Sequence, residues 1–261
     1  VKVQYGTDPQ SSESRTKIVL HTGMDAVRTG YTKGIHWHIQ NEVRFVSPDP
    51  QRREIPWVEV VKADGTKVFN LTAAITDWEV SPGNVVKAWT YNGQVPGPWI
   101  RVEPGDRVRV NLTNNLPIST EIHWHGIDVP FDQDGVAPIT QDYVRPLETY
   151  TYEYTVQDNP GMGMFHAHFH GQVGIVNGLF GIFQVGDVPL PLGRTVGNVA
   201  IPADLDVTTI QEVPMVLNDA GVIGLSLNGK SFPATQPIAA KEGESVLVPS
   251  FNEGLQRHPL H

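Results

Sequence analysis

The sequence of 261 residues contains no cysteine. Disulfide bonds, iron–sulfur clusters and metal sites with a thiolate ligand are therefore excluded within it. Basic residues are also few, since 19 Lys and Arg stand against 28 Asp and Glu, for a net charge of -9. This charge, together with the lack of any basic run, argues against nucleic acid as a partner.

Long apolar runs are missing as well. The longest, residues 173–183, is interrupted by Gly174, Asn177 and Gly178 and is too short to span a bilayer, so no membrane partner is expected. Glycine and proline are frequent by contrast, with 25 and 21 residues. They separate short apolar runs along the whole chain, which is typical of an all-β protein with many turns.

The ten histidines are clustered. Seven of them lie in three short stretches, residues 121–126, 165–171 and 258–261. Residues two apart in an extended strand share a face, so His123 and His125 are predicted to point the same way. The same spacing predicts that His166, His168 and His170 line up on one strand face. Such clustering suits a site for several metal ions, and imidazole binds copper, zinc, iron and nickel alike.

Several stretches have the alternation or the apolar character of strands. They are residues 58–61, 67–71, 73–78, 107–112, 149–156, 166–170 and 179–185. The Asp64-Gly65 pair predicts a hairpin between the first two. Residues 161–164, with two methionines, are expected to form a flexible loop before the second histidine stretch. The Pro-rich segment 187–202 is expected to be a linker.

The second half of the chain repeats the order of turn motifs in the first half. Asn92-Gly93 and Gly105 recur as Asn228-Gly229 and Gly243. Counting 18 residues on from Gly105 gives His123, and the same count from Gly243 gives the last residue, His261. Measured against the first unit, the second unit is about 60 residues too short to form a complete domain.

This repeat predicts the domain organisation. We expect an N-terminal extension of no assigned role (1–55), a first β-domain (56–188), a linker (189–210) and the beginning of a second, incomplete domain (211–261). An incomplete sandwich leaves strand edges unpaired. Either another polypeptide or a second copy is therefore expected to complete it, or the sequence is a fragment of a longer protein.

Four motifs occur in a fixed order. They are Tyr91-Asn92-Gly93-Gln94-Val95-Pro96-Gly97-Pro98, Leu112-Thr113-Asn114-Asn115, His123-Trp124-His125-Gly126 and His166-Ala167-His168. In this order they resemble the multicopper oxidases, the laccase-like proteins built from cupredoxin domains. The resemblance covers residues 68–261 and is greatest to the small two-domain laccases. It implies a cupredoxin-like Greek-key β-sandwich, with one complete domain and the start of a second.

The resemblance also implies ligand roles in the first domain. His123 matches the family's ligand of the type 2 copper, and His125 matches a ligand of one type 3 copper. His166 and His168 match further type 3 ligands. His170 has no equivalent in the His-x-His pair, and an outer-shell role is the reading favoured for it.

In the second half, His258 matches a type 1 copper ligand, and His261 matches the second type 2 ligand. The family's Cys ligand of type 1 copper has no counterpart, because the sequence contains no cysteine. Asp134 resembles the acidic residue that acts as a proton relay in the family. The alternative is that Asp134 and Gly135 simply form a turn.

The resemblance implies a copper-dependent, laccase-like oxidase. Such an enzyme couples the one-electron oxidation of phenolic or similar donors to the four-electron reduction of O2 to water. It implies homotrimers with copper clusters between subunits, and a secreted or periplasmic location. The alternative is a non-catalytic copper-binding module or subunit that lacks the type 1 site. A zinc hydrolase is a weaker interpretation, because no Glu or Asp stands at a zinc-motif spacing.

Overall fold

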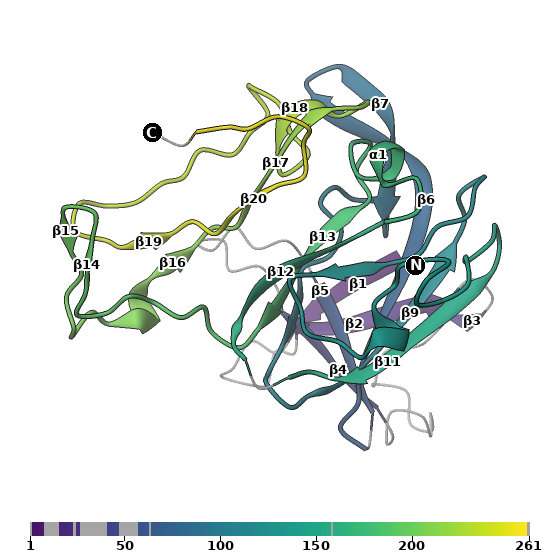
Figure 1. Ribbon diagram of the computed structural model, residues 1–261, viewed down its shortest axis with the longest axis horizontal. Helices are drawn as coiled ribbons and strands as arrows, with labels where there is room; N and C mark the ends of the chain where they lie inside the picture. Colours follow the sequence, from purple (N-terminus) through teal and green to yellow (C-terminus); the bar gives the residue numbers. More distant parts are fainter. Residues whose placement is uncertain are drawn as a thin grey trace.

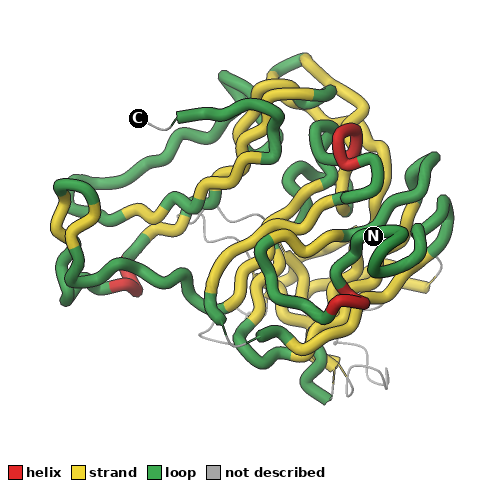
Figure 2. The backbone as a smooth tube through the Cα atoms, viewed as in Figure 1, coloured by secondary structure: helices red, strands yellow, loops and turns green. Residues whose placement is uncertain are grey.

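The computed structural model describes residues 2–7, 16–22, 25–26, 41–46, 57–62, 64–157 and 159–259. Strands dominate the described chain (Figure 2), and the prediction of an all-β protein is confirmed. Its only α-helix is α1 (Gly171–Gly174), a single turn, and η2 (Phe131–Gln133) and η3 (Val207–Thr209) are short 3-10 turns. No helix in the described part of the chain is long and apolar enough to cross a membrane.

The larger sheet has the strand order β11-β9-β6-β5-β4, with β7 also paired to β6 (Figure 1). The bounds are β4 (Asn41–Val46), β5 (Trp57–Lys62), β6 (Lys67–Ser81), β7 (Asn84–Tyr91), β9 (Arg107–Asn114) and β11 (Thr149–Thr155). The predicted hairpin at Asp64-Gly65 is confirmed, since β5 and β6 pair antiparallel across it. The two strands expected between residues 67 and 78 are one strand of 15 residues, which pairs first with β9 and then with β7.

The facing sheet has the order β10-β12-β13-β8. Its strands are β8 (Ile100–Val102), β10 (His123–His125), β12 (Gly161–His166) and β13 (Phe180–Val185). β10 and β12 are antiparallel neighbours, with His123 opposite His166 and Trp124 opposite Phe165. This register brings the first two histidine stretches together.

The main hydrophobic core lies between these two sheets. Trp124 is its centre, with the rings of Tyr152 and Phe183 each 5.4 Å from it in edge-to-face contact. A burial pattern in which Trp124 is covered while His125 is exposed follows from the strand alternation that the sequence predicts. Burying aromatic rings of this size supplies much of the stabilisation of such a sandwich.

A second core lies on the outer face of the β10-β12-β13-β8 sheet. All six residues of β13 are buried, and Phe180 and Ile182 pack there with Trp99, Met164 and Val216. β13 therefore contributes to two cores, which explains its nearly continuous apolar sequence. The expectation of a flexible loop at residues 161–164 is wrong, because the segment belongs to β12 and packs into this core.

The remaining strands form small sheets. They are β1 (Lys2–Thr7), β2 (Thr16–Thr22) and β3 (Asp25–Ala26) in one sheet; β14 (Thr195–Val196) with β15 (Val199–Ala200); β16 (Gln211–Glu212) with β19 (Val246–Leu247); and β17 (Met215–Ala220), β18 (Gly224–Leu227) and β20 (Ser250–Asn252). The segment expected to be a plain linker thus contains the short β14–β15 hairpin. Strands β14, β15, β16 and β19 form an arm that projects from the sandwich (Figure 1).

The repeated Asn-Gly turns have the same local structure. Asn92 has a φ of 57°, its amide N–H donates to the carbonyl of Thr72, and its side-chain oxygen accepts the Thr72 N–H. Asn228 has a φ of 49° and makes the same pair of bonds with Val216. Each turn is also followed by glycine in the left-handed region. The start of the second half therefore repeats a strand–turn arrangement of the first.

Candidate metal centre

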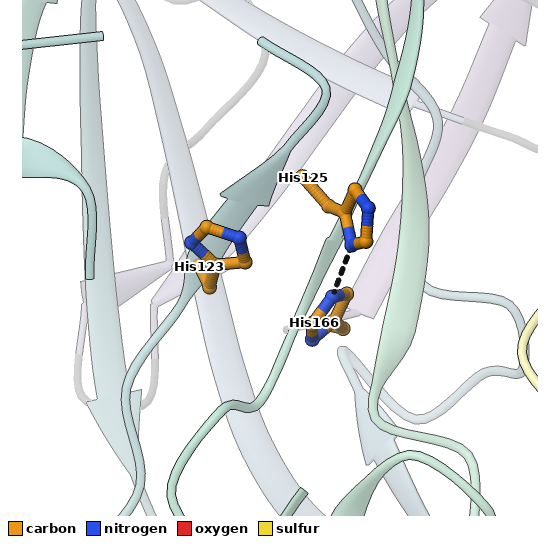
Figure 3. A group of neighbouring side chains, drawn as sticks. All are labelled: His123, His125 and His166. Atoms are coloured by element: carbon orange, nitrogen blue, oxygen red, sulfur yellow. Dashed lines mark hydrogen bonds between the residues drawn. The ribbon is translucent and has the colours of Figure 1, made fainter. Parts of the chain in front are cut away.

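Three histidines from two neighbouring strands form the centre of the site. His123 and His125 come from β10, and His166 ends β12. One ring nitrogen of each lies within 4.8 Å of those of the other two. Figure 3 shows the three rings around a common space. The prediction that His123 and His125 share a face is therefore confirmed.

The imidazole of His166 is oriented by the backbone. Its Nδ1–H donates to the carbonyl oxygen of Ala167 at 3.0 Å, so the lone pair is on Nε2. That Nε2 lies 3.1 Å from Nδ1 of His125. Burial lowers the pKa of His166 to about 4, which keeps the ring neutral and its lone pair available at neutral pH.

His123 is oriented in the same manner by a loop. Its Nδ1–H donates to the backbone carbonyl of Asp134 at 2.9 Å, which leaves Nε2 free for a metal ion. A carboxylate oxygen of Asp134 also lies 3.4 Å from this Nδ1. The loop reaches this position because Gly135, with a φ of 74°, packs directly on the backbone of Ile122.

His168 adjoins the group from outside the strand. Its exposed ring lies 5.5 Å from that of His123, at an angle of 74°. Burial of part of the ring, and then the neighbouring His123, lower the pKa of His168. The prediction that His166, His168 and His170 line one strand face is wrong, because β12 ends at His166 and the chain turns. His170 has a φ of 52°, and its ring lies 4.1 Å from that of Phe169.

The histidines of the second half lie elsewhere or outside the described residues. Nε2 of His258 lies 2.7 Å from a carboxylate oxygen of Asp219, and His258 is not in the three-histidine group. The same carboxylate accepts the backbone N–H groups of Leu255 and Gln256. His261 lies outside the described residues, so its predicted role stays a prediction.

Glu121 is a site residue that sequence reasoning missed. It is fully buried, and its Oε1 accepts the backbone N–H groups of His168 and Phe169. Burial raises the pKa of Glu121 to about 7. Glutamate two residues before a histidine has no distinctive spacing, so only the folded chain reveals this contact.

The donor set fits copper. Three imidazoles, at least one of them held neutral, converge on one space, and imidazole nitrogen is a good ligand for copper, zinc, iron and nickel. An open pocket of about 500 Å³ borders the group, lined by His166, His168, His170 and the first turn of α1. The pocket leaves room for a small molecule beside the metal ligands.

Comparison with known proteins identifies the relatives of this chain. Residues 73–189 match the family model of the multicopper oxidases. A laccase of Pestalotiopsis fici is 38% identical over 110 residues, which are 41% of this chain and 18% of that protein. A copper resistance protein A homologue of Pseudomonas syringae pv. tomato is 38% identical over 109 residues, again 41% of this chain and 18% of that protein.

Two solved structures have the same fold over most of this chain. The multicopper oxidase mgLAC is 31% identical, with a TM-score of 0.61, and the match covers 72% of this chain and 61% of that one. The blue copper oxidase from Nitrosomonas europaea is 28% identical, with the same TM-score and coverage. The prediction of a cupredoxin-like β-sandwich is thereby confirmed. The matched segments span only about a fifth of the two curated relatives. The segment that matches the family model, residues 73–189, includes the strands that carry the histidine group. Over this segment, the chain is similar to the multicopper oxidase family.

Proposed function

We propose that this chain is part of a laccase-like oxidase that oxidises phenolic or similar donors one electron at a time and reduces O2 to water. The observation that carries the proposal is the convergence of Nδ1 of His125 and Nε2 of His166, 3.1 Å apart, beside His123. The similarity to laccases and copper oxidases supports it, and the family model matches the segment that holds these strands.

Four histidines of the first half would hold copper. We assign His123 to a type 2 copper and His125, His166 and His168 to a type 3 pair. His258 and His261 are assigned to a type 1 and a type 2 copper in the same proposal. When bound, copper supplies one-electron redox chemistry and a coordination position for O2.

The residues of the chain itself orient and protect this ligand set. The carbonyls of Ala167 and Asp134 fix the proton-bearing nitrogens of His166 and His123, so the other nitrogen of each ring faces the common space. We propose that the Asp134 carboxylate also relays protons for O2 reduction, since it lies 3.4 Å from His123 on the rim of the site. The turn formed by Asp134 and Gly135 serves this placement as well.

We further propose that a second copy completes the site, as a homotrimer, or that another polypeptide does so. His125 and His168 are exposed, and the loop after β10 carries Phe131 and Ile139, each 70% exposed. His258 lies beside Asp219 instead of in the three-histidine group. Such a site suits a partner that brings further ligands across a head-to-tail contact. On the family resemblance we place the protein outside the cytoplasm, secreted or periplasmic.

The proposed domain division follows the repeated turns. We divide the chain into a first cupredoxin-like domain (56–188), a connection (189–210) and the start of a second domain (211–261). The identical hydrogen bonds of Asn92 and Asn228 support equivalent positions in the two units. Residues 1–55 have no role in the proposal.

A second candidate function applies to the chain on its own. Type 1 copper in this family needs a cysteine thiolate, and the sequence contains no cysteine. The chain by itself is then a copper-binding module, and the thiolate comes from polypeptide outside the printed sequence.

Intact mass, copper content and visible absorption of the purified protein distinguish the two functions. For a protein of the mass of the printed sequence, we expect bound copper, no intense blue band and no O2 uptake with a phenolic donor. A heavier protein with a blue band and O2 uptake supports the oxidase. Failure of the wild-type chain to bind copper would overturn both proposals.

A further inference from the structure

We infer that Glu121 is a positioning residue for the metal centre. Its carboxylate holds the backbone at His168 and Phe169, and thereby sets the orientation of the His168 imidazole toward His123. The inference rests on the proposed function, because it concerns the same histidine site. It adds a residue that contacts no metal ligand atom yet determines where one ligand lies.

The contacts of Glu121 are specific and buried. The side chain is 0% exposed, and Oε1 accepts the N–H of His168 at 2.8 Å and the N–H of Phe169. Burying a carboxyl group is costly unless hydrogen bonds offset its loss of hydration. Two backbone donors on Oε1 offset part of that cost, and they fix the chain path at two consecutive residues.

The path of the chain explains why the N–H groups of His168 and Phe169 need an acceptor at this point. Up to His166 the backbone is held by the ladder between β12 and its neighbours, and the N–H of Ala167 still donates to Leu179. Beyond Ala167 the chain leaves the sheet, so the next two N–H groups lose their strand partners. Glu121 supplies an acceptor for both, directly where the chain turns.

The same geometry couples two ligand strands. Glu121 lies two residues before His123, in the segment that leads into β10. Its carboxylate therefore connects the segment that carries His123 to the loop that carries His168, and the two rings lie 5.5 Å apart. Without that connection, the His168 backbone keeps the hydrogen bond from the Gly171 N–H to its carbonyl. Phe169 keeps its packing on Tyr143, with ring centres 4.3 Å apart. These contacts leave the backbone of His168 freer to rotate than it is with the two further hydrogen bonds.

The geometry also defines a conservative replacement. A glutamine at position 121 keeps an oxygen that accepts two N–H groups, whereas alanine removes it. If acceptor geometry is what matters, Glu121→Gln retains the site and Glu121→Ala does not. Glu148→Ala is a matched control, because the Glu148 carboxylate also accepts a backbone N–H, that of Arg145 at 2.9 Å, in an exposed turn outside the histidine group.

The test uses the full chain and three readouts. Amide proton shifts of His168 and Phe169 are measured in the metal-free protein, copper affinity by titration with Cu(II), and ligand geometry by electron paramagnetic resonance of the bound Cu(II). For Glu121→Ala we expect upfield shifts of both amide protons, a copper affinity about 10–100-fold lower and a changed resonance spectrum. Glu121→Gln and Glu148→Ala are expected to match the wild type in affinity and spectrum.

The outcomes separate this inference from the proposed function. A folded Glu121→Ala protein with wild-type copper affinity and spectrum would overturn the positioning role. If Glu121→Ala does not fold, the Glu121→Gln variant is used to test the positioning role. A folded Glu121→Gln protein with an altered copper spectrum would overturn that role as well. Failure of the wild-type chain to bind copper defeats the proposed function, while the amide shifts and the resonances of the His168 ring still test the positioning by Glu121.

Discussion

Nδ1 of His123 lies 2.9 Å from the backbone carbonyl oxygen of Asp134. A backbone acceptor cannot be removed by replacing the side chain of Asp134, so the orientation of His123 depends on the path of the loop. That path requires Gly135, where an added Cβ would lie 1.6 Å from the carbonyl oxygen of Ile122.

Gly135→Ala is therefore expected to lower the free energy of unfolding by about 3 kcal/mol or more and to weaken copper binding. The clash with Ile122 forces the loop away, and the His123 ring loses its acceptor. Gly83→Ala is the control, since Gly83 has a similar φ of 77° but nothing within 4 Å of the added Cβ. It is expected to cost only about 1 kcal/mol. Equal losses in urea denaturation would contradict the role of the close approach.

His166→Ala is expected to lower copper affinity by more than the 10–100-fold that loss of an outer-shell partner costs. Its neutral Nε2 faces Nδ1 of His125, and no other described histidine occupies that position. His170→Ala, which removes a nearby exposed ring outside the three-histidine group, is expected to lower copper affinity by no more than the 10–100-fold of an outer-shell residue. Calorimetric titration of both variants checks this, and equal affinities would exclude His166 as a ligand.

Asp219→Ala is expected to loosen the loop before the last histidines. The variant loses the acceptor for the N–H groups of Leu255 and Gln256 and for the His258 ring. Hydrogen exchange at these two amides should quicken about tenfold or more. Asp206→Ala is a control, because Asp206 accepts the Thr208 N–H in a different turn. Unchanged protection at Leu255 and Gln256 would show that the loop is held by other contacts.

Glu253 gives the chain a pH-dependent stability. Burial raises the pKa of its carboxyl from 4.5 to about 7. The stabilising effect of the protonated form is therefore complete below pH 4.5 and is lost as the pH rises through 7. Glu253→Gln is expected to leave stability unchanged at pH 4 and to raise it by about 1–2 kcal/mol at pH 8, after allowance for partial exposure. Urea denaturation at the two pH values checks this, and an equal effect at both would contradict it.

The features that the sequence predicts correctly depend on short-range rules. The alternation of His123, Trp124 and His125 follows from the two-residue period of a strand, so the shared face and the buried indole are both foreseeable. The repeated Asn-Gly turns are foreseeable too, because few residues other than Asn and Gly adopt a positive φ readily.

What could not be predicted depends on contacts between distant segments. His168 leaves the strand face because Glu121, 47 residues earlier, binds its backbone N–H. The continuity of β6 across residue 72 results from two different partner strands, each pairing with one half of it. Neither partner is encoded within the strand, so a local pattern suggests two short strands instead of one long one.

The strands β12 and β13 lie between the two cores and contribute side chains to both. The metal centre and the C-terminal half should therefore unfold as one cooperative unit. His166 and Met164 are both on β12, and Met164 packs with Val216 of β17 in the second core. A ligand that binds β12 only in the folded state also stabilises the elements packed against β12 and β13. By thermodynamic linkage, copper at the histidines should then tighten the docking of β17, and a cavity at Val216 should weaken the hold on copper.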